Sequence, residues 1–320
     1  MKEVYLGPEC DQRYIKTYLE NIRKLDPIEI ATLPNPLSLD DRNKLDSVID
    51  SDLFWENVDK WLSIFEKRYA FKPTIVNPKK YYTSLPEKIY VVGGFHDQSS
   101  LGYQYWYHAS FVLALNKNLA SKELRTVELL RSYLHDCLHH STYRSFRRAI
   151  RIPAESPRVA KHRLPEIYRE QYGINFRNQD GHSYSSPELT IHSPKTINLN
   201  LLMDGVIVLV VAEILQDILK EEVTPKDHLE NEILKEILVQ PFDATTLPRA
   251  NKFHSAVTEP TKKFIDFWGG TTLITLVLQA MESGNLDYLK DFFQKRTGLE
   301  TAWEMLFRDQ KFSLPLNYTV

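Results

Sequence analysis

The chain contains almost none of the cysteine from which covalent cross-links or thiolate metal sites are built. Its 320 residues include two cysteines, Cys10 and Cys137, which are too far apart in the sequence to form a zinc-binding pair. Two cysteines also make no disulfide framework, so we expect a reducing compartment, the cytoplasm. No internal repeat and no low-complexity tract is present, which argues against a repeat architecture.

Long apolar runs and an excess of one charge are missing as well. The longest apolar run, residues 206–212, is too short to cross a bilayer, and residues 1–10 lack the apolar segment of a signal peptide. We therefore expect no membrane partner. The formal net charge of −2 gives no overall field that attracts nucleic acid, although a nucleic-acid partner stays open. With 42% hydrophobic and 26% charged residues, the composition is typical of a soluble globular protein.

Apolar residues recur at helical spacing along most of the chain, and this periodicity predicts a mainly α fold. The segment 200–220 is apolar on all sides, which is typical of a buried central helix. Short strands are predicted at residues 89–92 and in a β arm between 190 and 200. Asp52 and Ser121 are expected to cap the helices that follow them. The other predicted helices cover residues 11–26, 53–69, 103–115, 122–141, 227–239, 259–268, 271–282, 285–295 and 299–308.

Histidine is concentrated in one part of the sequence. Four of the ten histidines fall within a 33-residue window, at positions 108, 135, 139 and 140. His135 is followed directly by Asp136, so one helical turn offers a nitrogen and an oxygen ligand, and a divalent metal accepts both. His139 lies one turn after His135. The sequence therefore predicts a metal site on the helix expected over residues 122–141.

Two carboxylates, Asp204 and Glu213, interrupt the apolar segment 200–220. A carboxylate in a buried helix is costly unless it is paired or bound to a metal. Asp204 is therefore our candidate for the carboxylate that completes the metal site. Asp180 and Asp217 are rivals for the same role, because each also follows the histidine cluster in the sequence.

Positive charge is concentrated directly after the histidines. Residues 144–163 hold seven basic residues against the single acid Glu155, a net charge of +6. Such a run forms either a solvated basic surface or an anion-binding wall beside the metal site. Arginine suits the second role because its planar fork matches the geometry of phosphate. The basic residues are Arg144, Arg147, Arg148, Arg151, Arg158, Lys161 and Arg163.

The order of the metal-binding residues resembles the HD superfamily of metal-dependent phosphohydrolases. A lone histidine lies in Tyr105-Trp-Tyr-His-Ala-Ser, the His-Asp pair in Leu134-His-Asp-Cys-Leu-His, and a distant aspartate in Leu202-Met-Asp-Gly. The resemblance covers about residues 100–220 and implies an HD-like helical bundle with additional N- and C-terminal helices. It also implies a ligand set, which consists of His108, His135, Asp136 and Asp204.

The resemblance implies a domain organisation and a chemistry. Residues 1–98 would form an N-terminal helical extension, and residues 99–320 a catalytic helical domain with C-terminal helices, the two in one compact body or as separate domains. The expected function is a phosphohydrolase or phosphodiesterase that acts on a nucleotide or another phosphorylated small molecule. One or two divalent metal ions (Mn, Mg, Fe, Zn or Co) would lower the pKa of bound water and polarise a phosphoryl oxygen.

Catalytic roles follow for residues near the expected metal. His139 would bind a second metal or protonate the leaving oxygen as a general acid. Arg144, Arg147 and Arg148 would neutralise the charge that develops on the phosphoryl oxygens. His140 points about 100° away from His139 on a helix, and we do not expect it to share that role.

Two alternatives keep the helical fold and change the function. An HD-fold di-iron oxygenase would take two further histidine ligands between the His-Asp pair and the final aspartate. His162, His182 and His192 lie in that interval. The basic run would then bind an anionic substrate. The other alternative is a non-catalytic helical interaction protein, in which the histidines are hydrogen-bonded core residues.

A zincin-like metallopeptidase is the last alternative. His135 and His139 are four residues apart and would bind zinc, with Glu213 as the third ligand. The zincin motif, however, places a glutamate after the first histidine as general base. Asp136 is one methylene shorter, so it would reach a zinc-bound water poorly. This alternative also gives His108 no role.

Overall fold

The computed structural model divides the chain into two compact units, and each unit is assembled from separate stretches of sequence. Unit 1 contains Met1–Glu20, Ser141–Ile207 and Glu259–Val320, and unit 2 contains Asn21–His140 and Val208–Thr258. From the sequence we expected a domain boundary after residue 98, and the division into two units has no boundary at that position. The structure describes residues 3–22, 49–69, 89–93, 102–105, 110–115, 121–150, 164–171, 175–178, 183–184, 199–219, 234 and 252–307.

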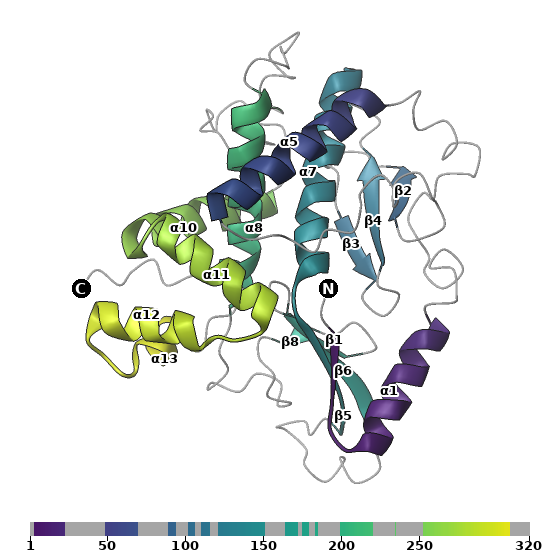
Figure 1. The fold of residues 1–320 in the computed structure, drawn as a ribbon, viewed down its shortest axis with the longest axis vertical. Coiled ribbons are helices and arrows are strands. Elements are labelled where there is room, and N and C mark those ends of the chain that lie inside the picture. Colours follow the sequence, from purple (N-terminus) through teal and green to yellow (C-terminus); the bar gives the residue numbers. More distant parts are fainter. Residues whose placement is uncertain are drawn as a thin grey trace. The chain divides into compact units, whose positions relative to one another are not determined.

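Helices account for most of the residues that the structure describes, which confirms the predicted mainly α class (Figure 1). The agreement is closest for α7, Lys122–Ser141, and for α8, Asn200–Leu219, whose ends lie within one residue of the prediction. Both helices have long apolar stretches. Apart from residue 234, the helix predicted at 227–239 lies outside the described residues, and so do residues 190–198 of the predicted β arm.

In unit 2, helix α5, Ser51–Tyr69, lies across α7 and contacts it through aromatic rings (Figure 1). The ring of Tyr133 on α7 lies 5.4 Å from that of Phe54 and 6.2 Å from that of Trp55, both in edge-to-face geometry. Such pairs add to the stabilisation that apolar burial provides. The predicted apolar face of α5 therefore packs into the core of this unit. Its fully buried members are Phe54, Val58, Trp61 and Phe65.

The start of α5 is capped by a residue other than the one predicted. The Oδ1 atom of Asp50, and not the Asp52 side chain, accepts a hydrogen bond from the backbone N–H of Leu53 at 3.0 Å. Asp52 already lies inside the first turn. The backbone N–H of Asp50 donates to Thr126 Oγ1 on α7 at 2.7 Å. The same residue therefore caps α5 and ties it to α7.

Asp50→Ala is expected to lower the free energy of unfolding by about 1 kcal/mol, because it removes this cap. Asp52→Ala is the matched control. It removes a carboxylate that interacts only with the helix dipole, so we expect a loss of about 0.3 kcal/mol. Urea denaturation of the two variants measures the difference. Equal losses would show that Asp50 is not the cap.

The helix predicted over residues 103–115 is wrong. Gly102–Tyr105 and Ser110–Leu115 are strands β3 and β4, which pair antiparallel. β4 also pairs parallel with β2, Ile89–Gly93, so it is the central strand of the sheet β2-β4-β3 in unit 2. A short apolar run fits a buried strand as well as a buried helix, and here strand partners on both sides decide the outcome. The strand predicted at 89–92 is confirmed.

In unit 1 a five-stranded sheet contains the start of the basic run. β5, Arg144–Ala149, follows α7 and pairs parallel with β1 and antiparallel with β6. The strand order is β1-β5-β6-β7-β8. This sheet was not predicted, because its strands are polar and lack a clear alternation. The remaining strands are β1, Glu3–Leu6; β6, Glu166–Gln171; β7, Asn175–Asn178; and β8, Ser183–Tyr184. The helix α1, Glu9–Ile22, follows β1.

The C-terminal helices of unit 1 share an aromatic core around Phe293. Five aromatic rings have centroids within 6.4 Å of the Phe293 ring, and they come from three helices. The rings belong to Phe264 and Trp268 on α10, Phe292 on α12, and Trp303 and Phe307 on α13. The four predicted helices in this region are all present: α10, Lys252–Trp268; α11, Thr271–Ser283; α12, Asp287–Thr297; and α13, Ala302–Phe307.

Helix α8 is the most apolar helix and is buried along almost its whole length. Its prediction as a central helix is therefore confirmed. Among the helices in the described stretches, none is both long enough and apolar enough to cross a membrane alone. Pro260–Trp268 and Thr271–Ser283 meet those criteria only as a pair, with a bend of 108° between them.

Candidate metal site

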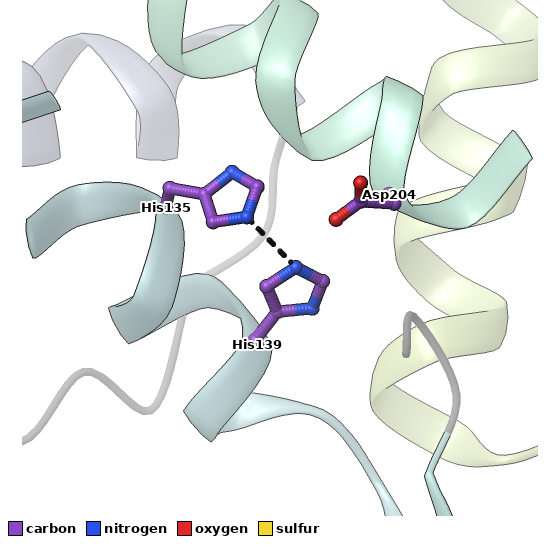
Figure 2. Close-up of side chains that lie close together, drawn as sticks. All are labelled: His135, His139 and Asp204. Carbon is purple, nitrogen blue, oxygen red and sulfur yellow. Dashed lines mark hydrogen bonds between the residues drawn. The ribbon is translucent and has the colours of Figure 1, made fainter. Parts of the chain in front are cut away.

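Three side chains come together at one point: His135 and His139 from α7, and Asp204 from α8 (Figure 2). One nitrogen of each histidine and one oxygen of the carboxylate all lie within 4.8 Å of one another. The Nε2 atoms of the two histidines are 3.0 Å apart, and the rings meet edge to face. His139 is buried, whereas His135 and Asp204 are half-buried. The group is therefore partly exposed to solvent, through His135 and Asp204.

The local structure of α7 explains why both histidines point the same way. Ser121 caps the helix as predicted, because its Oγ atom accepts a hydrogen bond from the backbone N–H of Leu124 at 3.1 Å. The helix then runs without proline or glycine to Ser141. Residues four apart on such a helix lie on one face, so His135 and His139 are neighbours. The apolar stripe that anchors α7 is buried and consists of Leu124, Val127, Leu130, Leu134 and Leu138.

The distances in this group suit a divalent metal. The two Nε2 atoms are 3.0 Å apart, which is close enough for both to bind one ion, because an imidazole nitrogen binds zinc at about 2.1 Å. One carboxylate oxygen of Asp204 lies within 4.8 Å of both nitrogens. Three protein ligands leave positions open for water and substrate, as in catalytic rather than structural metal sites. The three side chains could therefore hold a metal ion.

Two of the four metal ligands expected from the sequence belong to this group. His135 and Asp204 lie together, although they are far apart in the sequence. His139, expected as a ligand of a second metal or as a general acid, is a member of the group itself. His108 and the side chain of Asp136 lie outside the described part of the structure, so their participation stays a prediction.

The rival carboxylates do not join the two histidines. Asp217 forms an ion pair with Arg68 at 2.9 Å. Glu213, the third ligand in the zincin alternative, lies near Tyr69: burial, and then the negative charge of Glu213, raise the pKa of that hydroxyl to about 12. Along α8, Glu213 is about 13 Å from Asp204. The remaining candidates lie outside the described residues; they are Asp180, His162, His182 and His192.

The three arginines expected to contact phosphate lie on β5. Neighbouring positions on a strand face opposite sides, so Arg147 faces away from Arg144 and Arg148. Arg144 is buried. The guanidinium of Arg148 contacts α1, where it lies 3.3 Å from Asp11 Oδ1 and 4.2 Å above the Tyr14 ring. A single substrate can therefore face at most two of the three arginines.

A polar face of α7 was not predicted from the sequence. Glu128 and Ser132 are buried, and they lie on the same side of the helix as His135 and His139. The spacings between these four residues are four, three and four, which is the helical period. The signal was present in the sequence, but the apolar stripe of α7 masked it. The polar surface around the histidines thus continues for two turns toward the start of α7.

Comparison of the chain with protein-family models, with curated proteins and with solved structures finds no match. The group formed by His135, His139 and Asp204 therefore has to be interpreted from its own geometry. On that geometry, the three side chains could hold a metal ion.

Proposed function

We propose that this protein is a metal-dependent hydrolase of phosphate esters, and that His135, His139 and Asp204 hold its metal. The observation that carries the proposal is the position of these three side chains, whose ligand atoms lie within 4.8 Å of one another. Two histidines and a carboxylate with open positions form a ligand set common in hydrolytic metal sites. The expected substrate is a nucleotide or another phosphorylated small molecule.

A divalent metal at this position would supply a bound water of lowered pKa and would polarise a phosphoryl oxygen. The residues of the chain perform the remaining tasks. The two histidines and Asp204 fix the ion near the C-terminal end of α7. His135 and Asp204 are half-buried and not fully enclosed, and the hydrolase requires that water and substrate reach the ion on their side. This combination of a fixed ion and an open side is what metal-assisted hydrolysis requires.

Two features support phosphate esters over peptides as substrates. A zincin peptidase needs glutamate after the first histidine, and here Asp136 follows His135. The chain also passes from α7 directly into the arginine-rich strand β5, which places Arg144 five residues after His139. Arginine binds phosphate in a bidentate manner. The resemblance to the HD superfamily supports the same substrate class.

The test compares metal-stripped full-length protein with protein reloaded with Zn²⁺, Mn²⁺ or Fe²⁺. The protein is purified without a metal-affinity step, so that the purification adds no metal. We expect elemental analysis to find at least one ion per chain after reloading. We also expect the loaded form alone to hydrolyse p-nitrophenyl phosphate or bis-p-nitrophenyl phosphate. Equal rates with and without metal, or no bound ion, would contradict the proposal.

One observation favours a second candidate, an iron-dependent oxygenase. The observation is the ligand set itself, because two histidines and one carboxylate with open positions are the ligands of non-haem iron(II) oxygenases. This candidate predicts that the Fe²⁺-loaded protein consumes oxygen and releases no phosphate. The hydrolase predicts the reverse, so an oxygen electrode and a phosphate assay on the same sample distinguish them.

A further inference from the structure

Gly205 follows the proposed ligand Asp204 on α8, and it lies against α10 with almost no space between them. A Cβ atom at this glycine would be 2.2 Å from Oγ1, 2.7 Å from Cγ2 and 2.8 Å from Cβ of Thr261. All three distances are far below van der Waals contact. At this contact, α8 and α10 can therefore approach this closely only because residue 205 has no side chain.

Thr261 has little freedom to move away. Its side chain is fully buried. It is also β-branched, so few χ1 rotamers are available to it. Rotation about χ1 cannot relieve the contact with its own Cβ atom, because that atom is fixed by the backbone of α10. A methyl group added at Gly205 must consequently shift the backbone of α8, of α10 or of both helices.

A shift at Gly205 is transmitted to the metal ligand, because consecutive Cα atoms are about 3.8 Å apart and rigidly linked. Metal sites tolerate errors of only about 0.2 Å in ligand distance. From this contact we infer that Thr261 is a positioning residue. Its side chain fixes the distance between α8 and α10, and this distance determines the position of the Asp204 carboxylate. The inference rests on the proposed metal site.

The experiment measures the affinity of the full chain for Co²⁺, with the absorption spectrum of the bound ion as a readout of its coordination. Gly205→Ala is expected to weaken binding about tenfold or more, as changes in the support of a ligand do. It should also alter the spectrum. Thr261→Gly removes the three atoms that the new methyl would meet. The double variant Gly205→Ala/Thr261→Gly should therefore bind Co²⁺ within about threefold of the unaltered chain.

Gly269→Ala is the matched control, because a Cβ there would meet Phe292 Cζ at 2.9 Å, just after the end of α10. It adds a smaller clash eight residues along the chain from Thr261, so we expect a lower melting temperature with unchanged affinity and spectrum. Unchanged affinity in Gly205→Ala would overturn the inference. So would equal weakening in Gly269→Ala, or a double variant no better than Gly205→Ala.

Two further outcomes are decisive. If Gly205→Ala does not fold, the double variant carries the test: it must fold and bind Co²⁺, and loss of either property overturns the inference. If the unaltered chain binds no Co²⁺, Zn²⁺ or Mn²⁺ at all, the proposed function itself fails. The positioning role of Thr261 is then rejected as well. In that case the result that rejects it is the absence of metal binding by the unaltered chain, and not the behaviour of the variants.

Discussion

Asp204→Ala is expected to lower the affinity for the metal by roughly a hundredfold or more. Zinc sites with four ligands bind with about 10–16 kcal/mol, so one ligand contributes about 3 kcal/mol, which corresponds to that factor in Kd. Asp204 is the only member of the group that comes from α8. Its removal leaves two histidines on one helix. Isothermal titration with Zn²⁺ measures the change directly.

Glu213→Ala provides the control for this prediction. Glu213 lies on the same helix and is half-buried like Asp204, but its charge acts on Tyr69 and it is not a member of the group formed by His135, His139 and Asp204. Its removal should leave the metal affinity within about twofold of the original. Metal also raises the melting temperature of a protein that binds it in the folded state, and Asp204→Ala should lose this increase. Equal affinities of the two variants would remove Asp204 from the site.

Phe293→Ala is expected to lower the free energy of unfolding by about 3–5 kcal/mol, the largest effect on stability that we predict. The Phe293 ring is fully buried and contacts rings from α10, α12 and α13. Its loss leaves a cavity in the middle of that cluster and removes several edge-to-face contacts. Denaturation in guanidinium chloride, followed by tryptophan fluorescence, measures the loss, since Trp268 and Trp303 report on the same core.

Phe267→Ala is the matched substitution for comparison. Phe267 is 56% exposed and lies on α10, close in sequence to the cluster but outside its buried part. We expect it to cost about 0.5 kcal/mol, as exposed positions usually do. A loss for Phe267→Ala as large as that for Phe293→Ala would mean that the two rings are equally important. The aromatic cluster would then not be the core of the C-terminal helices.

The helices could be predicted from sequence wherever an apolar stripe was long enough to define the period. α7 has such a stripe and α8 is a twenty-residue segment that is apolar on all sides, and the ends of both helices were predicted to within one residue. The segment 103–115 has no stripe, only a run of aromatic and aliphatic residues, and the pairing of β4 with two other strands determines its structure. Strand pairing depends on residues outside the segment, so the pattern within residues 103–115 cannot reveal it.

The metal site was predicted in part for a similar reason. The His135–His139 spacing is local, and so is the presence of a carboxylate in an apolar helix, which identified Asp204. The arrangement of the arginines is not local. They lie on a strand whose partners are residues 3–6 and 166–171, and only the sheet reveals that Arg147 and Arg148 face opposite sides. The roles of His108 and Asp136 stay predictions.

The parallel pairing of β1 with β5 has a consequence for synthesis of the chain on the ribosome. Residues 3–6 pair with residues 144–147. At roughly 5–20 residues per second, about 7 to 28 seconds pass between translation of the two strands. During that time the hydrogen-bonding edge of β1 has no native partner to pair with. β1 therefore has to wait for β5 before it can pair, and a nascent-chain chaperone would find its edge exposed during that time.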